Sequence, residues 1–247
     1  MGRGRSPATR GGGSGKASDS SLATIMTDEE AYELVENEHL TSEQKMSVED
    51  YISNTDFDGQ GHSLSQTMNY LTDQGVDFEK ATASEINDKY GILLTDSDVA
   101  RMRTVSRELD SAMHPLGRPT VLERGAHDDL LRDQFGIDDY SSMSESQLKS
   151  RLVGQAFQNT SHMSTAYDPN KNPFTSKTSR VSGGREVIYN IKAGSDTKAV
   201  FGAITQSEIV IGKGTNFRIT DVRYSGVTAK PRGKASRPQI IVDVETF

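Results

Sequence analysis

The sequence predicts an α+β fold in which a helical N-terminal half packs on a β-rich C-terminal half. Three observations support this prediction. A helix-capping pattern recurs in the first half of the chain. Pro115 ends the helical part, and later residues alternate between apolar and polar with the period of two that strands require. Because helices are followed by strands without a clear linker, we expect one α+β domain.

The first 21 residues are mostly glycine, serine and arginine, with almost nothing to bury. We therefore expect a flexible tail over residues 1–21, a helical lead-in over residues 22–40 and a single domain over residues 41–247. Up to Lys16 the tail holds four bases and no acid. It is either an inert terminus or a weak contact for nucleic acid or another anionic surface.

Helices are expected where a Ser or Thr is followed three residues later by a Glu or Gln, because such a pair caps two free backbone amides at a helix start. Apolar residues at helical spacing follow each pair, and the run from Val99 to Met113 predicts a longer helix. We interpret these Leu and Met stripes as core packing rather than the lining of a ligand groove. The pairs are Thr27/Glu30, Thr41/Gln44, Ser63/Gln66 and Ser144/Gln147.

Strands are expected from Arg118 onward, and Arg118–Arg124 is the first candidate. Residues 167–184 are polar and rich in Asn, Ser, Lys and Gly, which is typical of a functional loop in a compact domain. The later strands are indicated by apolar residues that share one face, in the sets Val187/Tyr189/Ile191, Ile209/Ile211, Phe217/Ile219 and Ile240/Val242/Val244.

The composition excludes several classes of site. The chain has no cysteine, so disulfides, thiolate metal sites and cysteine nucleophiles are ruled out. Its five histidines form no HExxH string, and we expect no metal site. No apolar run approaches the length of a membrane span, and the N-terminus carries arginine and glycine where a signal peptide needs apolar residues. We expect neither a membrane span nor an export signal.

Charge is segregated along the chain, which has a net charge of −7. From Asp28 to Asp58 there are 11 acids and only one base, Lys45. From Lys213 to Arg237 there are seven bases and only one acid. This basic stretch indicates either an anionic ligand or partner, or a solvated strand edge with its loops.

Three strings in the β-rich half carry candidate functional residues: VLERG at 121–125, HMSTAYD at 162–168 and ITQSEIVIGKGTNFRI at 204–219. Taken singly, each is compatible with an ordinary surface ion pair, a β-branched strand or an edge residue. Their order and spacing carry the signal.

In this order the strings resemble the ADP-ribosyltransferase family, in the arginine–serine–glutamate branch that includes clostridial exoenzymes and phage-encoded enzymes. The resemblance covers roughly residues 40–247. It implies that the helical half packs on the mixed β-sheet core of that family. It also implies a mono-ADP-ribosyltransferase that uses NAD, needs no metal, modifies a host protein side chain and releases nicotinamide. The matching positions are Arg124-Gly125, Ser164-Thr165-Ala166 and Gln206-Ser207-Glu208, with Ala166 in place of a serine.

The resemblance assigns the catalytic roles to Glu208, Ser164 and Gln206. Glu208 would bind the ribose 2′-hydroxyl and stabilise the positive charge that develops as nicotinamide leaves. Ser164 would orient Glu208 from the neighbouring strand. Gln206 lies two residues before Glu208, on the same strand face, and would hold the acceptor group.

The same resemblance assigns residues that bind NAD. Arg124 offers a permanently charged planar fork for the pyrophosphate, and Gly125 allows the backbone to approach the nicotinamide closely. The loop at 167–184 resembles the family's phosphate–nicotinamide loop. The further candidates are Thr165, Phe174 for stacking on nicotinamide, and Arg180 or Arg185 for phosphate.

Several alternatives remain open. Gln206, where other members carry a glutamate, resembles the branch that modifies Asn, Gln or Thr side chains rather than arginine. Water in place of the acceptor would make the protein a NAD glycohydrolase. A catalytically silent structural or binding module of the same fold, for example in a virion, is the alternative outside enzymes. A dinucleotide-binding Rossmann unit is excluded because no GxGxxG string occurs. We expect the protein to act in a host cytoplasm after delivery by a phage or by secretion.

Overall fold

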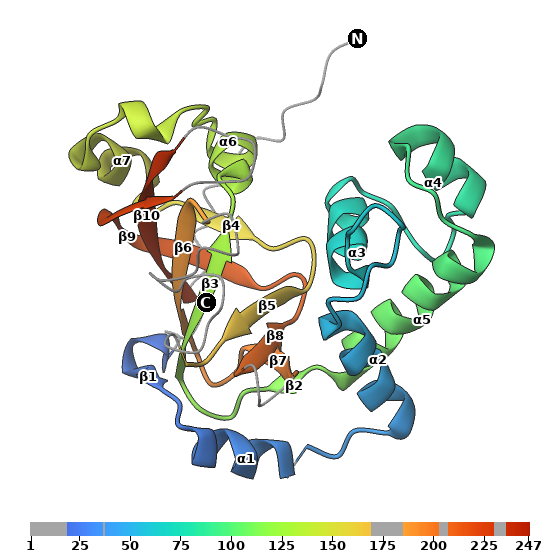
Figure 1. Cartoon of the computed structure of the whole chain (residues 1–247). Helices are drawn as coiled ribbons and strands as arrows, with labels where there is room; N and C mark the ends of the chain where they lie inside the picture. Colours follow the sequence, from blue (N-terminus) through green and yellow to red (C-terminus); the bar gives the residue numbers. More distant parts are fainter. Residues whose placement is uncertain (1–18, 37, 169–184, 203–206, 230–235) are drawn as a thin grey trace.

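The computed structural model describes residues 19–36, 38–168, 185–202, 207–229 and 236–247. Within these ranges the chain forms a helical lobe, made of α2 to α5, beside a sheet lobe that contains the strands with α1, α6 and α7 (Figure 1). The predicted α+β fold class is confirmed. The predicted tail over residues 1–21 lies mostly outside the described residues. Its last three residues do not, because Asp19–Leu22 is a 3-10 helix whose Asp19 carboxylate accepts the Ser195 backbone N–H at 2.8 Å.

The helices begin where their side chains cap backbone amides. The four predicted capping pairs all form. Two more pairs, Thr82/Glu85 and Thr95/Asp98, cap α4 and α5 in the same way, and the second uses the shorter Asp in place of Glu. In the described part of the chain the helices are α1 (Asp28–Glu36), α2 (Ser42–Ile52), α3 (Leu64–Asp73), α4 (Ala83–Tyr90), α5 (Asp96–Ala112), α6 (Asp129–Phe135) and α7 (Glu145–Leu152).

The strands form one mixed sheet in the order β2-β7-β8-β5-β3-β6-β10-β9-β4, and β1 pairs with β3 outside this path. Most neighbours are antiparallel, and β6 and β10 are parallel. The first expected strand was placed two residues too early. The bounds are β1 Thr24–Ile25, β2 His114–Pro115, β3 Thr120–Ala126, β4 Ala156–Gln158, β5 Met163–Ala166, β6 Val187–Ala193, β7 Lys198–Phe201, β8 Glu208–Ile211, β9 Asn216–Ala229 and β10 Arg237–Thr246.

Two hydrophobic cores meet at β7 and β8. Ile209 and Ile211 point into the core of the sheet lobe. Val210 points the other way, into the core of the helical lobe, together with Val200 of β7. Side chains two residues apart share a strand face, so Glu208 lies on the face of β8 that is turned towards the helical lobe.

Few backbone pairs join the half of the sheet that holds β5 and β8 to the half that holds β3 and β6. Strands β5 and β8 pair through four residues, and β3 and β6 through seven. Between these ladders, β3 and β5 share a single register pair, Glu123 with Ala166. The strands that carry two of the predicted site strings, β3 and β5, therefore share only one register pair.

The basic C-terminal stretch forms ion pairs where the structure describes it. Each of its described bases lies near a carboxylate, which favours the interpretation as ordinary strand surface over an anion site. The pairs are Lys213 with Asp110, Arg218 with Glu245, Arg223 with Asp243 and Arg237 with Asp128. Among the helices that are described, none has the length and apolar character to cross a membrane.

The capping box of α5 provides a test of the helical lobe. Thr95→Ala removes the hydroxyl that accepts the Asp98 backbone N–H at 3.2 Å. We expect the free energy of unfolding, measured by urea denaturation, to fall by about 1 kcal/mol. The control is Thr104→Ala, an exposed position in the middle of the same helix, which should change it by less than about 0.5 kcal/mol. Equal effects of the two changes would argue against the cap.

Candidate functional site

One pocket lies between the two lobes and gathers most of the predicted site residues. Its sheet wall comes from the ends of β3, β5 and β8 and from Arg185. Its helical wall comes from α2, α3 and the loop between them. The lining residues are Glu123, Arg124, Gly125, Ser164, Thr165, Ala166, Arg185 and Glu208 on one side, and Ile52, Asn54, Ser63, Ser65, Gln66 and Asn69 on the other.

Glu208 is the acidic group of β8 in this pocket. Burial raises the pKa of its carboxyl above the ordinary value, while a hydrogen bond with the Ser164 side chain and the charge of Arg124 act in the opposite direction. The backbone of Ala166 lies opposite Glu208 in the strand pairing. Ser164 lies on the neighbouring strand β5 and hydrogen-bonds the Glu208 carboxylate, and its role in orienting that carboxylate stays a prediction.

The residue before Glu208 has an unusual backbone. Ser207 has φ of 53°, in the left-handed region that residues other than glycine rarely adopt. It is fully buried, and its carbonyl oxygen accepts the Tyr167 backbone N–H at 2.9 Å. Such a conformation persists only where the surroundings fix it, and it is typical of functional sites. Here it marks the start of β8.

Arg124 connects the two halves of the sheet at the pocket. Its Nη1 donates to the backbone carbonyl of Ser164 at 3.0 Å, beside the single register pair of β3 and β5. The pKa of the second arginine, Arg185, is lowered, first by burial and then by the charge of Arg124. Two guanidinium groups that repel one another in a partly desolvated pocket would be stabilised by an anion.

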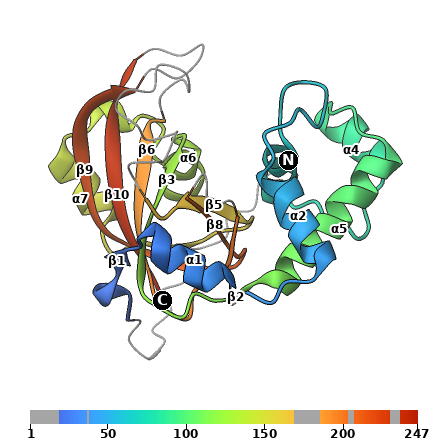
Figure 2. The ribbon, with the colours of Figure 1, turned by 60° about the horizontal axis from the view of Figure 1, so that its bottom comes forward.

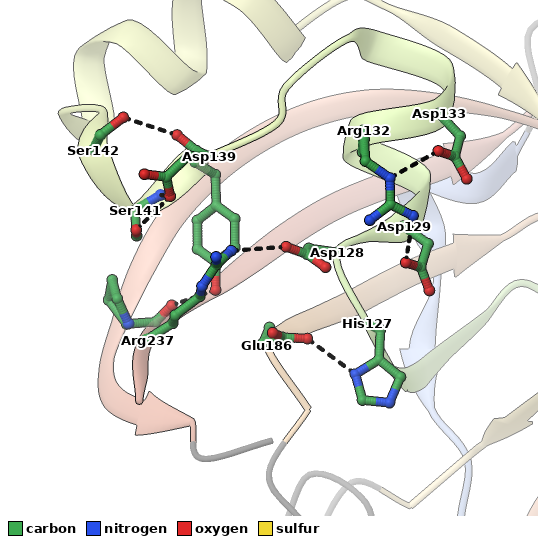
Figure 3. Close-up of polar contacts among 12 residues, drawn as sticks. His127, Asp128, Asp129, Arg132, Asp133, Asp139, Ser141, Ser142, Glu186 and Arg237 are labelled. Carbon is green, nitrogen blue, oxygen red and sulfur yellow. Dashed lines mark hydrogen bonds and ion pairs between the residues drawn. The ribbon is translucent and has the colours of Figure 1, made fainter. Parts of the chain in front are cut away.

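Arg185 contacts His127, which in turn is hydrogen-bonded to the buried Glu186. Nδ1 of His127 donates to Oε2 of Glu186 at 2.9 Å, and the other ring nitrogen contacts Nη1 of Arg185. Figure 3 shows His127 turned towards Glu186, next to the ion pair of Asp128 with Arg237. Glu186 is fully buried. The carboxylate fixes the imidazole, and the imidazole fixes the arginine.

The remaining predicted residues have different outcomes. Thr165 lines the pocket, but its hydroxyl donates to the Ile209 carbonyl at 2.7 Å and so joins β5 to β8. Its contact with NAD stays a prediction. Gln206, Phe174 and Arg180 lie outside the described residues.

The sequence did not indicate the polar helical wall. Gln66 and Asn69 lie on the face of α3 opposite its buried Met68 and Leu71. Asn69 accepts a hydrogen bond from the Tyr51 hydroxyl at 3.0 Å. An amphipathic pattern predicts which face of a helix is buried, but not what the other face meets, so no signal in the sequence identified this wall.

The pocket combines a carboxylate held by a serine with two arginines on the same wall. This set can stabilise a developing positive charge at Glu208 and hold a phosphate-containing ligand at the arginines. Within the described ranges, no group of three or more His, Asp or Glu side chains is placed to hold a metal ion.

Comparisons with known proteins agree with this arrangement. The family model "ADP-ribosyltransferase exoenzyme" matches residues 28–246. No curated protein sequence matches the chain.

Several solved structures share the fold. The C3 exoenzyme of Clostridium limosum is 17% identical, with 91% of this chain and 97% of that chain covered and a TM-score of 0.56. C3stau2 from S. aureus, solved with NAD, is 15% identical, with 91% and 98% covered and a TM-score of 0.56. Plx2a, a toxin of Paenibacillus larvae, is 13% identical, with 89% and 96% covered and a TM-score of 0.55.

The raised pKa of Glu208 predicts a pH-dependent effect on stability. Above the ordinary Glu pKa of about 4.5, the folded protein carries the cost of a buried ionised carboxylate, which Glu208→Gln removes. We expect the variant to melt at a higher temperature than the wild type near pH 7.5. The difference should shrink as the pH falls through the raised pKa of folded Glu208 and disappear below about 4.5, where the carboxyl is protonated in both folded and unfolded chains. Melting curves at several pH values test this, and a constant difference would contradict it.

Proposed function

Because the chain belongs to the ADP-ribosyltransferase exoenzyme family and is therefore an NAD-dependent mono-ADP-ribosyltransferase, we propose that the pocket between its lobes binds NAD, with Glu208 as the catalytic carboxylate. The observation that carries this assignment is the meeting of Glu208, Ser164, Arg124 and Arg185 in one pocket from four separate segments. Glu208, Arg124 and Arg185 are all only partly exposed, and a carboxylate and two arginines gathered in one partly desolvated pocket are typical of a functional site.

In the reaction, the bond between ribose C1 and the nicotinamide nitrogen breaks, and nicotinamide leaves as a neutral molecule with the bonding electrons. Positive charge then develops on the ribose. Ionised Glu208 stabilises this charge, in the way that carboxylates act in glycosidases. A lone pair of the acceptor side chain forms the new bond to C1, and the acceptor loses a proton. Ser164 keeps the carboxylate in place for this step.

Arg124 and Arg185 bind the pyrophosphate of NAD in this proposal. The two groups fit such a ligand because its negative charge offsets their mutual repulsion. His127 and Glu186 keep Arg185 in position from behind. Gly125, Thr165 and Phe174 complete the NAD contacts, as the family resemblance assigns them.

Gln206 is the proposed acceptor-binding residue, and it favours an Asn, Gln or Thr side chain over arginine. An amide can donate and accept hydrogen bonds with neutral polar groups, whereas a guanidinium is better matched by a carboxylate. We propose a host protein as the acceptor and a host cell as the site of action. The toxins among the solved structures of this fold support this role. Delivery by a phage and a weak anionic contact of the tail remain predictions.

The catalytic assignment predicts the effect of Glu208→Gln on activity. The amide keeps the shape of the side chain but removes the charge, so nicotinamide release should fall by about 10² to 10³. NAD affinity, measured by calorimetry, should stay close to that of the wild type. A variant that keeps more than a tenth of the wild-type rate would remove Glu208 from the catalytic role, and a wild type without turnover would favour a silent module.

The acceptor assignment predicts that Gln206 and Glu208 are separable. Gln206→Glu should keep nicotinamide release without acceptor within about tenfold of the wild type. Label transfer from NAD to proteins of a cell lysate should change its targets or disappear. If both activities are lost, Gln206 supports the NAD site itself. If both are kept unchanged, the acceptor is bound elsewhere.

A further inference from the structure

Asp28 at the start of helix α1, and Glu38 just beyond its end, contact residues on either side of the segment that leads into β8. This helix lies below β5 and β8 in Figure 2. We propose that Glu38, just after α1, is a positioning residue for the reaction: it fixes the end of β7, against which the side chain of Glu208 packs. This inference rests on the proposed role of Glu208.

Glu38 connects three segments that are distant in the sequence. Its Oε1 accepts a hydrogen bond from Nε2 of His114 at 2.6 Å and another from the backbone N–H of Phe201 at 3.1 Å. The Glu38 side chain is only 4% exposed. Hydrogen bonds to a carboxylate that is shielded from water are stronger than those between neutral groups. The contact therefore anchors the last residue of β7.

The residue after Phe201, Gly202, links the end of β7 to Glu208. The Gly202 N–H donates to the backbone carbonyl of Glu208 at 2.9 Å. A Cβ on Gly202 would lie 3.2 Å from Cγ of Glu208 and 3.2 Å from Cγ2 of Ile52. Gly202 is thus packed between the Glu208 side chain and the helical lobe. A shift of Phe201 would therefore move Gly202 and, with it, Glu208.

The other end of α1 supports the residue that precedes Glu208. The hydroxyl of Tyr167 donates to Oδ1 of Asp28 at 3.2 Å, and the backbone N–H of Tyr167 donates to the carbonyl of Ser207. Tyr167 is fully buried. Residues on both sides of the segment 203–206 are therefore connected to the two ends of the α1 region, Asp28 and Glu38.

α1 is itself well anchored, so it can act as a fixed support. Glu30 closes the capping box with Thr27 and forms an ion pair with Arg118 at 2.6 Å. Ala31 is buried in the core of the sheet lobe. The family model also begins at residue 28, which places α1 inside the family's domain.

The test compares three variants of the full chain. Glu38→Ala removes both hydrogen bonds, whereas Glu38→Gln keeps an oxygen that can accept them. Glu36→Ala is the matched control, because it removes an exposed carboxylate from the last residue of α1, two residues before Glu38. The measurements are amide hydrogen exchange at Phe201, and the kcat and KM of nicotinamide release from NAD.

For Glu38→Ala we expect Phe201 exchange to accelerate by at least about tenfold. The kcat should fall by about tenfold, while KM for NAD stays within about twofold because the two arginines are untouched. Glu38→Gln should restore kcat to within about twofold of the wild type. Glu36→Ala should leave the melting temperature, Phe201 exchange and kcat unchanged.

Two results would overturn the inference: unchanged Phe201 exchange and kcat in Glu38→Ala, or the same losses in Glu36→Ala, which would mean that the effect does not come from the hydrogen bonds of Glu38. Glu208→Gln, measured in parallel, separates this inference from the proposed function. If Glu208→Gln stays active, the role of Glu208 is wrong. If it is inactive while Glu38→Ala behaves as wild type, only the inference about Glu38 is wrong.

Discussion

The alternation of side chains along β8 determines where the site can be. Ile209 and Ile211 belong to the core of the sheet lobe, whereas Val210 belongs to the core of the helical lobe. With both faces committed, Glu208 can only point to the side of the helical lobe, at the end of β8 where the pocket opens. A register shift of one residue would exchange the faces and place the carboxylate in an apolar core, which is very costly for a charge. Folding and the proposed catalytic role of Glu208 thus require the same register.

The charged forms of Glu208 and Arg185 are disfavoured by their surroundings in the pocket. Burial disfavours the ionised form of Glu208 and the protonated form of Arg185, and Arg124 adds repulsion to the second. Each group has a neighbouring side chain that holds it: Ser164 hydrogen-bonds the Glu208 carboxylate, and His127 contacts Arg185. NAD carries negative charge at its pyrophosphate and develops positive charge at its ribose. Its binding and reaction would therefore relieve both unfavourable situations.

The sequence predicted the parts of the structure that depend on local interactions. The capping pair at Ser63 was recognised because its donors and acceptors lie three residues apart. Thr82/Glu85 has the same pattern and was overlooked, whereas Thr95 falls outside the pattern because its partner is an aspartate. Asp19 was assigned to a tail, since its partner Ser195 is remote in the chain. The sheet side of the pocket followed from motif residues, but Asn69 on the helical side carries no signature. Long-range contacts of ordinary residues leave no pattern in a single sequence.

The Arg124 side chain both lines the pocket and holds two strands together. The same guanidinium that faces the pocket also bonds the carbonyl of Ser164, where β3 and β5 share only one register pair. A ligand that binds the Arg124 side chain would therefore also affect the contact between β3 and β5. If Arg124 binds NAD as proposed, replacing it would alter NAD affinity and the contact between β3 and β5 together, so no single substitution at this position would report on one of them alone.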